Sequence, residues 1–152
     1  MSHATDIGTD RLLDMSRPEL DRLFRYSPPG EIPKGKGLGT VLLGLDPKMN
    51  ALAAMLARRL AWQGKVFDSD GRGLRNLVSP FGIRAVRARV YRDLSWSDQG
   101  ACIVLDYAHT SLVAHWIRDE IRSVGQGVYL GNVYWGRRKV LDFSLTFGDA
   151  RT

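Results

Sequence analysis

The residues with the greatest potential for chemistry in this 152-residue sequence are an acid, a base and a cation that lie close together in the chain. Asp106 and His109 follow an apolar run, and Arg118 comes shortly after them. Around one bound molecule, Asp106 or His109 would take a proton while Arg118 holds a developing anion. The same residues also fit a structural role, with Asp106 and Arg118 paired and His109 in solvent.

Aromatic residues form a second set of candidates, for ligand binding rather than for catalysis. If the sheet of this protein closes, some of its aromatic side chains must line the interior, where pockets for apolar ligands occur. Aromatic side chains also dominate ordinary cores, so a purely structural role stays open. The candidates for ligand binding are Trp62, Tyr91, Tyr107, Tyr129 and Trp135.

Motifs for several other chemistries are missing from the sequence. The three histidines, His3, His109 and His115, form neither HxH nor HExxH, and the sequence has no GxSxG nucleophile elbow. The glycine-rich residues 31–39 match no phosphate-binding pattern and indicate a strand whose backbone passes close to another element. The single cysteine, Cys102, lies in an apolar context typical of a core residue. We therefore expect no metal and no cofactor.

Composition indicates one globular domain, with 44% hydrophobic and 25% charged residues. The net charge of +6 is uneven, and arginines concentrate in residues 84–92. Such a basic segment favours polyanions, which makes a nucleic-acid-binding module one alternative function. The sequence contains neither an apolar run long enough to span a membrane nor a signal peptide, so we expect a cytoplasmic location.

Three segments have helical signals. The first starts at Ser16, which with Glu19 forms a capping box around Pro18. The second runs over residues 46–60 and begins with an Asp-Pro pair. The third covers residues 110–124, where apolar side chains recur every three or four positions. We expect this third helix to close one end of the sheet and to carry Arg118 to the mouth of a pocket.

Strand signals fill much of the remaining chain. Apolar and polar residues alternate most clearly over residues 83–91 and 140–147, and shorter β-rich runs occupy residues 40–43, 65–67, 101–107 and 128–135. This order predicts an α+β fold, with a mainly antiparallel, curled or closed sheet and about three helices at its ends or on one side. We expect residues 1–15 to form a flexible tail and residues 16–150 a single domain.

A series of short motifs resembles the small bacterial proteins that carry the GXWXG and DUF4334 modules. The motifs are WQGKVF at residues 62–67, IRD at 117–119 and YLG at 129–131, with apolar strands around them. The glycine-tryptophan-glycine signature of those proteins has its counterpart in KGLG at residues 36–39, which lacks the tryptophan. The resemblance implies a calycin-like barrel, the architecture of lipocalins and fatty-acid-binding proteins, and no particular activity.

These observations lead to a main hypothesis and two alternatives. The main hypothesis is a barrel that binds a small, largely apolar molecule, either neutral or anionic, such as a fatty acyl or aromatic compound. The first alternative is a small enzyme of the isomerase, cyclase or lyase type that acts on such a ligand by proton transfer. The second is the nucleic-acid-binding module that uses the basic segment.

Overall fold

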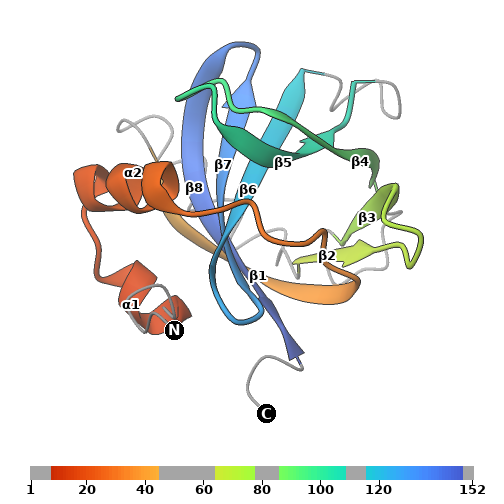
Figure 1. Ribbon diagram of the computed structural model, residues 1–152, viewed down its shortest axis with the longest axis horizontal. Helices are drawn as coiled ribbons and strands as arrows, with labels where there is room; N and C mark the ends of the chain where they lie inside the picture. The colour runs from red at the N-terminus through yellow and green to blue at the C-terminus, as the bar shows by residue number, and fades with distance from the viewer. Residues whose placement is uncertain (1–7, 45–63, 78–85, 109–115, 149–152) are drawn as a thin grey trace.

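Alternation of apolar and polar residues along the strands produces a closed barrel of antiparallel strands (Figure 1). The computed structural model describes residues 8–44, 64–77, 86–108 and 116–148. Each strand pairs with its neighbours in sequence, and β1 closes the barrel by pairing with β8. The predicted mainly antiparallel sheet, curled or closed, is confirmed, and it is closed. Its strands are β1 Gly35–Gly44, β2 Gly64–Phe67, β3 Gly73–Leu77, β4 Val86–Leu94, β5 Ala101–Asp106, β6 Ile117–Gly125, β7 Val128–Trp135 and β8 Arg138–Phe147.

The two faces of β4 show how the pattern assigns side chains to the inside and the outside of the barrel. Ala88 and Val90 are buried in the apolar interior, whereas Arg87 and Arg89 are exposed on the outer face. Successive side chains of a strand point to opposite faces, so one apolar series is sufficient to orient the whole strand. The arginines at positions 87 and 89 therefore face solvent.

Closure of the barrel between β1 and β2 depends on a close approach of two backbones. Gly64 has φ +118°, and a Cβ atom at this position would collide with the carbonyl oxygen of Gly37. Only glycine tolerates both the dihedral angle and the contact. The glycine-rich segment thus allows two strands to approach each other closely. This is the role expected for it from the sequence, which matches no phosphate-binding pattern.

Two short helices cover part of the outer surface of the barrel. They are α1 Thr9–Leu13 and α2 Arg17–Tyr26. Ser16 caps α2 through the predicted capping box, in which Ser16 Oγ accepts from the backbone N–H of Glu19 and Glu19 Oε1 accepts from that of Ser16. The buried side chains of the helices form a second apolar cluster against β6 and β7: Leu12, Leu20, Phe24, Val124, Val128 and Leu130.

The expected helix over residues 110–124 is wrong for the part that the structure describes. Residues from Ile117 onward form β6, whose partners are β5 and β7. The apolar residues Ile117 and Ile121 are four positions apart, a spacing that fits both one face of a helix and one face of a strand. Val124 belongs to the opposite face of the strand and is buried there under α2. The apparent helical stripe therefore combines residues from two faces of one strand.

The number and positions of the helices also differ from the prediction of about three helices. The described residues contain only α1 and α2, and the predicted helix over residues 46–60 lies outside them. Residues 9–13 belong to the expected flexible tail, yet they form α1 because Leu12 is fully buried against the barrel. Burial of one large apolar side chain holds this short helix in place.

Candidate functional site

Three polar side chains meet inside the barrel, in a position where apolar residues are the rule. Lys65 shares the inner face of β2 with Phe67, and Asp119 lies between Ile117 and Ile121 on the inner face of β6. Tyr107 directly follows β5 and completes the group. Each residue is at most 3% exposed. We call Lys65, Tyr107 and Asp119 the interior polar site.

Lys65 is the centre of the interior polar site. Its Nζ donates a hydrogen bond to Tyr107 Oη over 2.7 Å and lies 3.1 Å from Asp119 Oδ2. The ammonium group also lies over the rings of Tyr107 and Phe143, 5.4 Å and 5.5 Å from their centroids. An ammonium ion is expensive to bury, and these contacts replace part of the water that it loses.

Burial and mutual charge interactions shift the pKa values of all three groups. Burial acts to lower the pKa of Lys65, but the interactions with Tyr107 and Asp119 outweigh this effect and leave its pKa raised. Burial raises the pKa of the Asp119 carboxyl, and the ammonium of Lys65 offsets only part of the rise. Burial also raises the pKa of Tyr107 to about 12, so its phenol stays neutral at physiological pH.

One atom of the interior polar site lacks a hydrogen-bond partner. Among the described residues, Asp119 Oδ1 is buried and has no hydrogen-bond partner, although Oδ2 of the same carboxylate contacts Lys65 and the Tyr107 hydroxyl also interacts with the Asp119 carboxyl. A buried acceptor without a partner costs roughly 1–3 kcal/mol, and more when the group is charged. Native proteins leave few such atoms, so Oδ1 marks a position where a hydrogen-bond donor would be stabilised.

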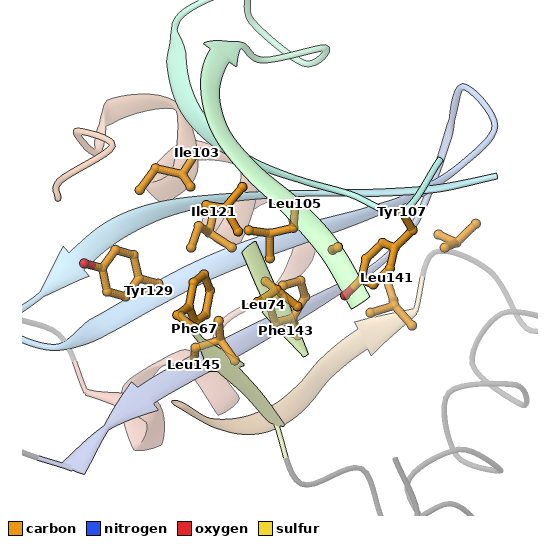
Figure 2. Close-up of a cluster of buried hydrophobic side chains, with 13 residues drawn as sticks. Phe67, Leu74, Ile103, Leu105, Tyr107, Ile121, Tyr129, Leu141, Phe143 and Leu145 are labelled. Atoms are coloured by element: carbon orange, nitrogen blue, oxygen red, sulfur yellow. The ribbon is translucent and has the colours of Figure 1, made fainter. Parts of the chain in front are cut away.

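The surroundings of the interior polar site are apolar. Figure 2 shows the side chains that converge in the barrel from several strands, with Tyr107 and Tyr129 at opposite ends of the cluster. Phe67, Phe143 and Leu105 lie between these two tyrosines. The arrangement places one group of polar side chains within the hydrophobic core of the barrel.

The structure places two of the three predicted catalytic residues on the outer face of the barrel. Asp106 and Arg118 are directly opposite each other in the pairing of β5 with β6, so the sequence correctly indicated their proximity. However, Asp106 Oδ2 accepts a hydrogen bond from Tyr91 Oη over 2.7 Å, and Arg118 forms an ion pair with Glu120 over 3.0 Å. His109 lies outside the described residues.

Arg118 stabilises the turn that links β4 to β5. Its guanidinium donates to Glu120 Oε2 and to the carbonyl oxygen of Leu94, and lies 4.3 Å from the centre of the Trp96 ring. Glu120 is fully buried and also accepts from Ser95 Oγ and from the backbone N–H of Trp96. Arg118 therefore secures a buried carboxylate and a turn, and does not face the barrel interior.

The predicted ligand-binding aromatic residues separate into different environments. Tyr107 and Tyr129 belong to the interior cluster, and Tyr129 Oη donates to the carbonyl oxygen of Glu31 over 2.6 Å. Tyr91 is on the outer face, and Trp135 is 53% exposed. Trp62 lies outside the described residues.

Comparison with known proteins gives evidence about the fold. No protein-family model matches the chain, and no curated protein is similar to it in sequence. A solved structure, described as the crystal structure of a protein from Thermomonospora curvata, superimposes with a TM-score of 0.60. It is 20% identical in sequence, and the match covers 88% of this chain and 88% of the other. The likeness shows a shared fold alone.

Lys65 and Asp119 are the site residues that reasoning from the sequence missed. For Lys65 a signal was present, because alternation within GKVF puts Lys65 on the same face as the apolar Phe67. For Asp119 the signal was lost when residues 110–124 were assigned to a helix, in which Asp119 falls largely off the apolar face. Only the assignment to β6 places it between two inward isoleucines.

Other surface features are less suited to an apolar ligand. Two hollows of about 580 Å³ and 590 Å³ are on the outside of the barrel, one beside Arg25 and Arg122 and the other beside Trp96 and Arg137. Within the described ranges, no cluster of three or more His, Cys, Asp or Glu side chains is placed to hold a metal ion. No helix in the same ranges is long and apolar enough to cross a membrane.

Arginines concentrate on the outer face of β3 and β4 and in the bend just before β3, and we call this group the arginine surface: Arg72, Arg75, Arg87 and Arg89. All four are exposed. Arg75 is directly opposite Arg87 in the pairing of the two strands, and like charges in this position are destabilising. Arg87 donates to Asp68 over 2.7 Å, which offsets part of the repulsion. The remaining positive charge suits an anionic partner.

Proposed function

We propose that this protein binds a small, largely apolar molecule inside the barrel and holds its polar group at the interior polar site. The observation that carries the proposal is Asp119 Oδ1, a buried carboxylate oxygen without a hydrogen-bond partner in the described part of the chain. The apolar body of the ligand would contact the interior aliphatic and aromatic side chains. An eight-stranded barrel is about wide enough to be filled by side chains or to hold one small ligand.

The buried charges themselves support a role in binding. Replacing a buried ion pair by apolar residues of similar volume is often neutral or stabilising, so the fold alone does not require Lys65 and Asp119. An ion pair inside an apolar barrel, with one oxygen unsatisfied, is explained by a ligand that completes its hydrogen bonds. The calycin-like resemblance of the sequence agrees with the same function.

The alternative of catalysis by Asp106 and Arg118 has little support from the geometry. Both side chains are engaged by outer-face partners, Tyr91 and Glu120, and neither contacts the apolar interior. Acid–base chemistry requires the catalytic groups within hydrogen-bond reach of the reacting atoms of the substrate. Binding in the barrel is therefore the function that we propose.

A calorimetric titration tests the proposal. Wild-type protein should bind decan-1-ol, decanamide or another medium-chain compound from a panel, with saturation at one equivalent. The double variant Lys65→Met/Asp119→Leu should fold, because it replaces the ion pair by apolar residues, and should bind these compounds at least about tenfold more weakly. The matched control Arg75→Met removes an exposed cation and should bind as wild type does. Equal affinity of the double variant and wild type would contradict the proposal.

A second candidate function is the binding of a polyanion such as nucleic acid at the arginine surface. The observation that favours it is the cross-strand position of Arg75 and Arg87. Fluorescence anisotropy with a labelled oligonucleotide at low salt should then show binding that weakens steeply as salt rises. Arg75→Gln/Arg89→Gln should weaken it, whereas Arg11→Gln/Arg22→Gln on the helices should not. Equal effects of the two double variants would indicate attraction by net charge alone.

A further inference from the structure

The charges of the interior polar site limit the kind of ligand group that it accepts. The ammonium of Lys65 and the carboxylate of Asp119 sum to zero, and the neutral phenol of Tyr107 adds nothing. A ligand carboxylate would place a second anion beside Asp119 in an apolar interior. A ligand ammonium would place a second cation beside Lys65. In a medium of low dielectric constant both arrangements are costly, so a neutral group is favoured.

The existing hydrogen bonds determine whether the neutral group of the ligand must donate or accept a hydrogen bond. Lys65 Nζ already donates to Tyr107 Oη and contacts Asp119 Oδ2. The unsatisfied atom, Asp119 Oδ1, can only accept while the carboxylate is ionised. A group that completes this site must therefore donate a hydrogen.

We infer that the ligand presents a neutral hydrogen-bond donor, a hydroxyl or an amide N–H, to Asp119 Oδ1 from an otherwise apolar body. The inference rests on the proposed function and narrows it, since it excludes the anionic ligand that the sequence suggested. The cation that would neutralise an anion, Lys65, is already neutralised by Asp119. Arg118 is not available in its place, because it contacts Glu120 on the outer face.

Four compounds with the same decyl chain separate the possible polar groups. In calorimetric titration of the wild-type protein, decan-1-ol and decanamide should bind at least about tenfold more tightly than decanoate and decylamine. Tighter binding of decanoate or decylamine would overturn the inference and leave the proposed function intact. Binding of none of the four compounds would remove the proposed function and the inference with it.

The variant Asp119→Asn provides a second test. It retains the shape of the side chain but changes the charge of the site from zero to +1, so the preference should move toward decanoate by about tenfold relative to decan-1-ol. The control Asp106→Asn makes the same change on the outer face and should preserve the wild-type order. Circular dichroism establishes that both variants fold. An unchanged order in folded Asp119→Asn would overturn the inference.

Discussion

At the scale of single residues, Lys65 is a cation enclosed by the barrel. Its ammonium is neutralised by Asp119 over 3.1 Å, and its hydrogen bond to Tyr107 supplies a further polar contact. Removal of the cation leaves a carboxylate in an apolar environment. The expected consequence is large, because an unpaired buried charge is among the costliest defects in a folded protein.

Lys65→Met should lower the free energy of unfolding by about 3–5 kcal/mol, as measured by urea denaturation. Adding Asp119→Leu should recover most of the loss, since it removes the carboxylate that was left unpaired. Lys36→Met, which removes an exposed lysine from the neighbouring strand β1, should change the stability by less than about 0.5 kcal/mol. A single variant Lys65→Met as stable as Lys36→Met would show that the ion pair is not buried as described.

Gly131 is a residue whose missing side chain makes room for an aromatic ring. It is opposite Phe143 in the pairing of β7 with β8, and a Cβ atom at position 131 would collide with the Phe143 ring. Gly131→Ala should therefore lower the free energy of unfolding by about 1–3 kcal/mol through overpacking. The double variant Gly131→Ala/Phe143→Leu should show less than additive destabilisation in the same denaturation experiment. Strict additivity would mean that the two positions do not share space.

At the scale of elements, one arginine ties helix α2 to the barrel. Arg122 of β6 is 2% exposed and donates from Nη1 to the carbonyl oxygen of Phe24, near the C-terminal end of α2. The same guanidinium forms two hydrogen bonds with Asp98, of 2.7 Å and 2.8 Å, and its Nε donates to the carbonyl oxygen of Ala101. Helix, strand and turn therefore share one buried cation.

Arg122→Met should lower the free energy of unfolding by about 3 kcal/mol and loosen α2 selectively, because it leaves the Phe24 carbonyl and Asp98 without their donor. Hydrogen exchange followed by mass spectrometry should show that α2 exchanges faster in the variant than in wild type. Exchange in β7 and β8 should change only as much as the loss of global stability requires. Arg25→Met, an exposed arginine of the same helix, is the control and should leave exchange unaffected. Uniform acceleration over all elements would contradict a specific docking role.

At the scale of the whole molecule, folding partly or fully buries several groups that release protons only at alkaline pH. Burial raises the pKa of Cys102, Tyr91, Tyr107 and Tyr134 to about 12 in each case, compared with 9.0 for a free cysteine and 10.0 for a free tyrosine. The pKa of Lys65 is also raised. All of these shifts make the free energy of unfolding fall as the pH rises through the alkaline range.

The free energy of unfolding should fall as pH rises from about 9 to about 12. In that interval the unfolded chain has lost protons that the folded protein still holds, so rising pH favours unfolding. Tyr107 alone contributes about 3 kcal/mol, from a shift of about two pKa units. Urea denaturation at several pH values measures the slope, which Tyr107→Phe should reduce and Tyr26→Phe, at an exposed tyrosine, should not. A constant stability over this range would contradict the burial of these groups.

Several features of this protein followed from its sequence alone, because local residues determine them. The capping box of Ser16 and Glu19 starts α2 as predicted, and alternation in β4 separates the buried Ala88 and Val90 from the exposed Arg87 and Arg89. A mainly antiparallel sheet, curled or closed, was predicted from the number of short strands and their turns. These predictions depend on neighbours in the chain, which a sequence displays directly.

The tertiary structure decided the identity of β6 and the composition of the interior polar site. Residues Ile117 and Ile121 satisfy the period of a helix and of a strand, and pairing with β5 and β7 resolves the ambiguity. Lys65 and Asp119 are far apart in sequence, and no local pattern indicates that they form one ion pair. They meet because closing the sheet brings the inner faces of β2 and β6 to the same interior, where the two opposite charges stabilise each other.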